Sequence, residues 1–219
     1  MSKMSSKQVV AALLMAAMAA TFVFGATTLK RPAVPSADAS AQASKKAPAA
    51  TQKSNAETTA PKGAHVAIAF DFNRADKKGT DQFAIWIEDS QGKLVRTIYV
   101  TNYTVKKGAA KYSFDLPTWS EKSGIHDNAN AADAVAGATP AKGHQTYYWD
   151  LTDQNKKAVA PGTYRIIVEG TQSKDEQVLF INDMVIGGDA ATVNVTPSYY
   201  TGTVPKDPML ASLTLTYKP

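Results

Sequence analysis

The amino-acid sequence predicts an all-β fold, an antiparallel β-sandwich, for the part of the chain that follows residue 63. Three observations predict it. Apolar residues alternate with polar ones in successive short runs, at the period of two that half-buried strands show. Glycine, proline, asparagine and aspartate separate those runs, as turn residues do. No ten-residue stretch of this part carries a helical apolar stripe, which favours two packed sheets.

Residues 1–29 are predicted to form a hydrophobic helix that directs export. Lys3 and Lys7 precede a run from 8 to 29 without a charged residue, and residues 9–26 are almost wholly apolar. This length fits a long signal peptide or a short membrane anchor. Either way the domain is expected outside the cytoplasm, in the periplasm or on the outer face of the membrane, to which an uncleaved segment would hold it. The absence of cysteine excludes a lipoprotein anchor and disulfides.

Residues 30–63 are predicted to form a disordered tether. They contain no aromatic residue, and Val34 is their only large aliphatic side chain, so they cannot bury enough surface to offset the entropy of ordering. Net charge divides at the same place, with +6 in residues 1–63 and −1 in residues 64–219. A nucleic-acid-binding domain would need its basic residues clustered on the folded part. We therefore expect no nucleic-acid partner.

The domain, residues 64–219, begins with three predicted strands. In the first, Val66 to Phe72, apolar residues alternate with Ala and Asp, and His65 is expected on its exposed polar face. Phe83–Ile87 and Leu94–Val100 flank Ser90-Gln91-Gly92, the pattern of a hairpin whose glycine supplies a positive φ. A further short strand is predicted from Lys111 to Leu116, ending at Pro117.

The second half of the domain is predicted to contain another hairpin and three further strands. Tyr147-Tyr148-Trp149 would lead into the turn Asp153–Lys156, and the return strand would be Thr163–Glu169. The remaining strands, which bring the total to eight or nine, are Val178–Ile186, Ala191–Thr196 and Leu210–Tyr217.

Between these halves lies the stretch that most invites a functional interpretation, Asp133-Ala-Val-Ala-Gly-Ala-Thr139-Pro140. Pro140 biases Thr139 toward an extended backbone, so the threonine hydroxyl is expected to project from a loop. Gly137 and the flanking alanines leave no bulk around that hydroxyl. Small residues around one hydroxyl suit a segment that must enter another protein's groove.

Residues Asp133 to Thr139 resemble the acceptor motif of bacterial FMN transferases: Asp, two variable residues, Ser or Thr, then Gly-Ala-Thr. Asp133, Gly137, Ala138 and Thr139 match, whereas Ala136 occupies the position where Ser or Thr is usual. The resemblance implies that Thr139 carries FMN through a phosphoester bond. A threonine hydroxyl is a weak nucleophile without an activating base or metal, so a separate transferase is the expected partner.

Two further resemblances concern larger parts of the chain. Trp149 to Glu169 is similar to the hairpin of immunoglobulin-like domains in flagellar hook-cap proteins and bacterial surface proteins. The order Phe83–Val100, the Gly-Ala-Thr loop and this hairpin resembles an uncharacterised family of exported bacterial proteins, associated with FMN transferases and membrane redox proteins. This implies an immunoglobulin-like sandwich that carries electrons beside membrane redox partners. The alternative is a non-redox immunoglobulin-like module for binding or assembly in the cell envelope.

Other chemistry finds little support in the sequence. No serine lies in a Gly-x-Ser-x-Gly elbow. His126, Asp127, Asp133 and His144 fit no compact ligand spacing, so no metal site is expected. We expect no catalytic residues, and an electron carrier or accessory module rather than a stand-alone enzyme.

Overall fold

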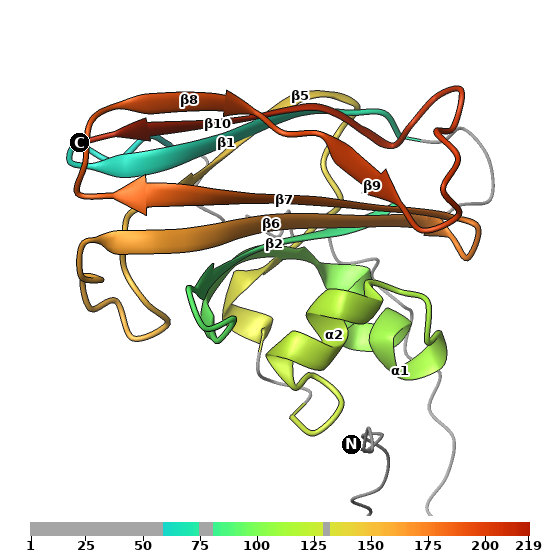
Figure 1. Ribbon diagram of the computed structural model, residues 1–219. Helices are drawn as coiled ribbons and strands as arrows, with labels where there is room; N and C mark the ends of the chain where they lie inside the picture. Colours follow the sequence, from blue (N-terminus) through green and yellow to red (C-terminus); the bar gives the residue numbers. More distant parts are fainter. Residues whose placement is uncertain (1–58, 75–80, 129–131) are drawn as a thin grey trace, which may run out of the picture. The chain divides into compact units, whose positions relative to one another are not determined.

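The computed structural model describes residues 59–74, 81–128 and 132–219 (Figure 1). The predicted leader, residues 1–29, and the tether up to residue 58 lie outside the described residues. Among the helices in the described ranges, none is long and apolar enough to cross a membrane.

The domain is a β-sandwich, as the alternating pattern predicts. Every strand pair is antiparallel except the pair of β3 with β4. The four-stranded sheet has the order β5 (Gly143–Trp149), β1 (His65–Phe72), β10 (Leu210–Lys218), β8 (Ala191–Asn194). The six-stranded sheet has the order β4 (Ala136–Gly137), β3 (Leu94–Thr101), β2 (Gln82–Asp89), β6 (Gly162–Ser173), β7 (Glu176–Ile186), β9 (Pro197–Tyr199).

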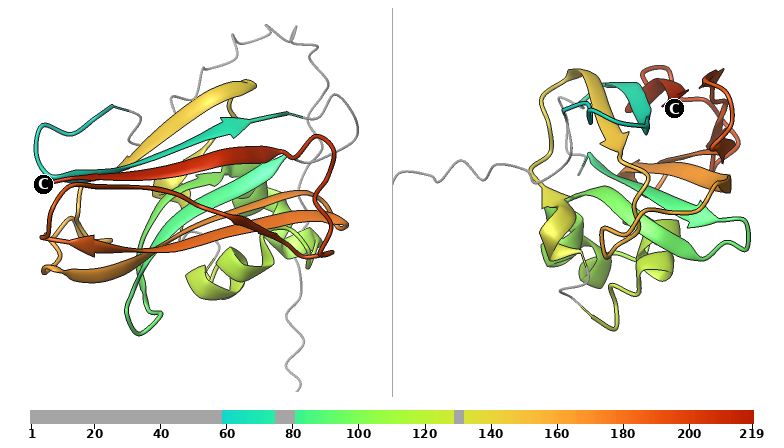
Figure 2. Two further views of the ribbon diagram at one scale, coloured as in Figure 1. Left: turned by 45° about the horizontal axis from the view of Figure 1, so that its top comes forward. Right: turned by 90° about the vertical axis from the view of Figure 1, so that its left-hand side faces the viewer.

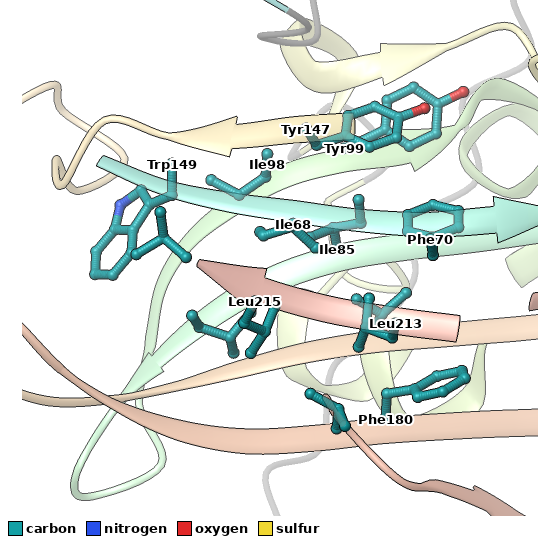
Figure 3. Packing of buried hydrophobic residues seen from close by; sticks show 14 of the residues in the cluster. Ile68, Phe70, Ile85, Ile98, Tyr99, Tyr147, Trp149, Phe180, Leu213 and Leu215 are labelled. Atoms are coloured by element: carbon teal, nitrogen blue, oxygen red, sulfur yellow. The ribbon is translucent and has the colours of Figure 1, made fainter. Parts of the chain in front are cut away.

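The main hydrophobic core lies between the two sheets. The alternating side chains of β1 point into it, and Phe70 packs edge-on against Phe83 of β2 with ring centroids 5.4 Å apart. Figure 3 shows apolar side chains from both sheets meeting in this layer. The period-two pattern of β1 therefore identified side chains that are buried between the sheets. Burial of apolar surface is the main source of stability in a sandwich.

A second apolar cluster covers the outer face of the six-stranded sheet, where the short helices pack (Figures 1 and 2). These are the π-helix η1 (Thr104–Gly108), α1 (Ala109–Lys111), α2 (Pro117–Ser123) and the 3-10 helix η2 (Asp133–Val135). Trp119 of α2 is fully buried against this sheet, and its indole nitrogen donates to the Thr97 hydroxyl at 3.2 Å. Trp119 thereby anchors the helices to β3.

The strand predicted from Lys111 to Leu116 is wrong. Lys111 ends α1, and the following residues turn until Leu116, whose φ of 49° is left-handed. Pro117 does end the preceding segment, but it does so as the first residue of α2, where its missing N–H is not needed. The alternation was too short to distinguish a strand from a buried turn.

The first predicted hairpin is confirmed and the second is wrong. β2 and β3 pair around Gly92, whose φ is 76°. The turn after Trp149 also forms, because the Asp153 carboxylate accepts from the backbone nitrogens of Asn155 and Lys157. However, β5 belongs to the four-stranded sheet and β6 to the six-stranded one. Leu151 has a φ of 57°, and there the chain leaves one sheet for the other.

The expected exposure of His65 is also wrong. Its residue exposure is 7%, because its ring packs edge-on against Tyr148 of β5 at 5.6 Å between centroids. The His65 Nδ1 lies 2.7 Å from the Gly63 carbonyl oxygen. β1 is an inner strand, so even its outward side chains gain neighbours.

Candidate functional site

The segment Asp133–Thr139 lies where the chain passes from one sheet to the other. After η2, β4 pairs in parallel with β3, with Ala136 opposite Val100 and Gly137 opposite Thr101. β4 is the edge strand of the six-stranded sheet, and β5, which follows, is the edge strand of the four-stranded sheet. The motif therefore runs along the side of the sandwich that is formed by these two edge strands.

A pair of buried tyrosines holds this segment from the side of the hydrophobic core. The Tyr99 hydroxyl on β3 donates to the Ala138 carbonyl at 2.7 Å. Tyr147 on β5 hydrogen-bonds Tyr99 through its own hydroxyl, and the two rings lie 4.8 Å apart (Figure 3). Burial raises the pKa of both phenols above the ordinary value of 10, so both hydroxyls keep their protons and remain donors at physiological pH.

The loop beyond Thr139 is anchored as well. The Gln145 side-chain nitrogen donates to the carbonyls of Ala141 at 3.0 Å and Gly143 at 3.4 Å. Thr139 and Pro140 are half-buried between these two anchors. Thr139 therefore sits in a surface loop whose backbone is fixed one residue before it and two residues after it.

Three of the four predicted site residues are consecutive and differ in burial. Gly137 is buried, Ala138 is exposed and Thr139 is half-buried. Asp133 is the first residue of η2, but its side chain lies outside what the structure describes. Ala136, the position that departs from the FMN acceptor pattern, is half-buried in β4.

Histidine and carboxylate side chains near the motif form a pair instead of a cluster. The His144 Nδ1 lies 3.1 Å from the Asp71 carboxylate across β5 and β1, and both side chains are largely exposed. Within the described ranges, no three His, Asp or Glu residues gather in a way that could hold a metal ion.

A second polar centre, which sequence reasoning missed, lies beneath α2. The Asp115 carboxyl is buried, and its Oδ1 accepts from the Thr104 hydroxyl at 3.0 Å. Its Oδ2 finds no hydrogen-bond partner among the described residues. The pKa of Asp115 is raised to about 6, mainly by burial and in smaller part by the charge of nearby Glu169, while the hydrogen bond from Thr104 opposes the rise. No sequence motif marks Asp115, because its environment comes from residues distant in the chain.

Glu169 of β6 caps the amino end of α2 from within the protein. Its carboxylate accepts from the backbone nitrogens of Thr118 at 3.1 Å and Trp119 at 2.8 Å, and from the Tyr200 hydroxyl at 2.9 Å. Such bonds satisfy helix N–H groups that have no partner within the helix. Burial raises the pKa of Glu169. The Glu169 carboxylate therefore holds α2 on the six-stranded sheet, whereas the Asp115 carboxyl bonds Thr104 of η1.

Comparison with known protein families shows the family to which the chain belongs. Residues 64–203 match the model of a family described as a predicted periplasmic protein (DUF2271). The chain belongs to this family. The match begins just before β1, and it contains the Asp133–Thr139 segment and both tyrosines below it. Membership agrees with the expected uncharacterised exported family and assigns the domain to the periplasm. No curated protein and no solved structure matches the chain.

Proposed function

We propose that this periplasmic protein is a flavoprotein of extracytoplasmic electron transfer, with FMN attached covalently to Thr139 by a separate FMN transferase. The observation that carries the proposal is the segment Asp133–Thr139. It resembles the transferases' acceptor motif, and its threonine lies in an anchored surface loop between two sheet edges. The membership in a periplasmic family supports the location that this function needs.

The attachment step defines what each partner supplies. FMN must arrive in an activated form, and a flavin adenine dinucleotide provides one in its pyrophosphate. The Thr139 oxygen attacks the phosphorus that bears the flavin, the bond between the two phosphates breaks, and AMP leaves. The hydroxyl proton passes to a base. Within the described residues near Thr139, the only side chains in the 138–143 loop are those of Ala, Pro, Lys and Thr139 itself, so we assign the base to the transferase.

A covalent flavin suits a protein outside the cytoplasm, where a dissociated cofactor would diffuse away. The flavin ring accepts one or two electrons, so it can connect two-electron and one-electron partners. Membrane redox proteins are the proposed donors and acceptors. The role of this chain is to hold the ring at the surface of a rigid sandwich, so it acts as a carrier.

Co-expression with an FMN transferase tests the proposal. The wild-type protein should become yellow, and its flavin should remain attached after denaturation. Thr139→Ala should remove the label while changing the free energy of unfolding by about 0.5 kcal/mol or less, as most substitutions in surface loops do. Thr196→Ala is the matched control, because Thr196 is an exposed threonine that also precedes a proline.

Thr196→Ala should receive as much covalent flavin as the wild-type protein. A label that persists in Thr139→Ala would contradict the assignment of the site. A wild-type protein from its native host that carries no flavin would contradict the function, and the non-redox binding or assembly module would take its place.

A further inference from the structure

The proposed acceptor segment is paired to the domain. Ala136 and Gly137 lie in register with Val100 and Thr101 of β3, and Gly137 is buried. The Ala138 carbonyl is bound by the Tyr99 hydroxyl. A transferase that encloses the Gly-Ala-Thr backbone in its own groove cannot reach Gly137 while this arrangement persists.

We propose that the Tyr99–Ala138 hydrogen bond is a latch that holds β4 on β3, and that the segment must open before Thr139 is modified. The inference rests on the proposed function and adds its regulation. The latch sets the rate of FMN attachment, and after attachment it limits the movement of the residue that carries the flavin.

The geometry indicates which side of the latch moves. Tyr99 is fixed, since its ring stacks on Phe83 at 4.9 Å and contacts Tyr147 at 4.8 Å inside the core. β4, by contrast, has two residues with small side chains and pairs at the edge of its sheet. Short edge segments with little buried apolar surface open at low free-energy cost, without unfolding the core. The loop therefore opens and the tyrosine stays.

The general strength of a hydrogen bond gives the expected size of the effect. The net strength of one such hydrogen bond corresponds to a change of about two- to tenfold in an equilibrium constant. When opening and closing are fast, a reaction of the open form follows the population of that form. Tyr99→Phe removes the donor and keeps the ring, so it should raise the labelling rate by about two- to tenfold when the transferase is limiting.

Tyr164→Phe is the matched control. The Tyr164 hydroxyl donates to the Ala160 carbonyl at 2.8 Å, a bond of the same kind that is remote from the motif in sequence. Labelling rates and amide hydrogen exchange at Gly137 and Ala138 would be measured for the full exported protein and both variants. Tyr99→Phe should accelerate both quantities, whereas Tyr164→Phe should change neither. An unchanged or slower rate in Tyr99→Phe would overturn the latch.

Two further measurements keep the outcomes distinct. Circular dichroism would verify that Tyr99→Phe folds. If it does not, Tyr147→Phe provides the test. It removes the hydroxyl that donates to the Tyr99 oxygen, and a hydrogen bond accepted by a hydroxyl strengthens the one that it donates. Tyr147→Phe should therefore weaken the Tyr99–Ala138 bond and accelerate labelling, to a smaller extent than Tyr99→Phe. If the wild type accepts no flavin, the proposed function fails and the gating of FMN attachment fails with it. The exchange data then still decide whether Tyr99 holds the segment closed.

Discussion

Replacing Asp115 by asparagine should change how the stability of the domain depends on pH. The pKa of Asp115 rises from 3.8 to about 6 on folding, so the folded state binds this proton more tightly than the unfolded chain does. Stability from this group is complete below pH 3.8 and is lost as pH rises toward 6. At about 1.4 kcal/mol per pKa unit, the loss amounts to about 3 kcal/mol.

The measurement is urea unfolding of both proteins at several pH values from 3.5 to 7.5. The free energy of unfolding of Asp115→Asn, relative to wild type, should rise by about 3 kcal/mol between pH 4 and 6 and then level off. The Thr104 hydroxyl can donate to the amide oxygen as it does to Oδ1, so the variant should fold. Glu169 also has a raised pKa, but it is present in both proteins.

Asp183→Asn supplies the control, because Asp183 is an exposed carboxylate paired with Arg165. It should show no such rise. Parallel pH profiles for wild type and Asp115→Asn, or a relative stability that falls between pH 4 and 6, would refute the raised pKa of the buried Asp115 carboxyl.

Three further predictions, which use four substitutions, test the packing that supports the site. Trp119→Ala should cost about 3–5 kcal/mol in thermal or urea unfolding, because the ring is fully buried on the six-stranded sheet; a loss below 1 kcal/mol would contradict that burial. Gly108→Ala should prevent native packing around Asp115, since the added Cβ would lie 1.6 Å from its Oδ2; a variant as stable as wild type would show that this contact is absent. Arg96→Ala should cost about 1.5–3 kcal/mol, because Asp150 loses the charge-assisted bond from the buried guanidinium but keeps its contacts with Thr152 and Lys156. Arg165→Ala, at an exposed pair, should cost about 1 kcal/mol or less. Equal losses in the two arginine variants would argue against a structural role for the pair of Arg96 with Asp150.

The sequence predicted those elements whose determinants are local. Alternation placed β1, and Gly92 placed the first hairpin, because a period of two and a positive φ are properties of adjacent residues. The crossing after Trp149 was missed, since the turn at Asp153 looks the same whether its flanking strands pair with each other or with strands of different sheets. Only long-range pairing decides between them.

The candidate site shows the same division. The motif indicated Thr139 directly, and Pro140 indicated that it lies in a loop. Its pairing with β3 and the Tyr99 anchor depend on residues about forty positions earlier in the chain, as the spacing between Tyr99 and Ala138 shows. The buried environment of Asp115 could not be predicted either, because its neighbours Thr104 and Glu169 come from other elements. A candidate residue in a local motif can be named from the sequence, whereas an environment assembled by folding cannot.

The most direct test of covalent FMN on Thr139 is the intact mass of the protein purified from its native host, followed by peptide mapping of residues 133–143. We expect one added FMN, linked with loss of water, on Thr139. An unmodified mass, or a flavin mapped to any other residue, would contradict it.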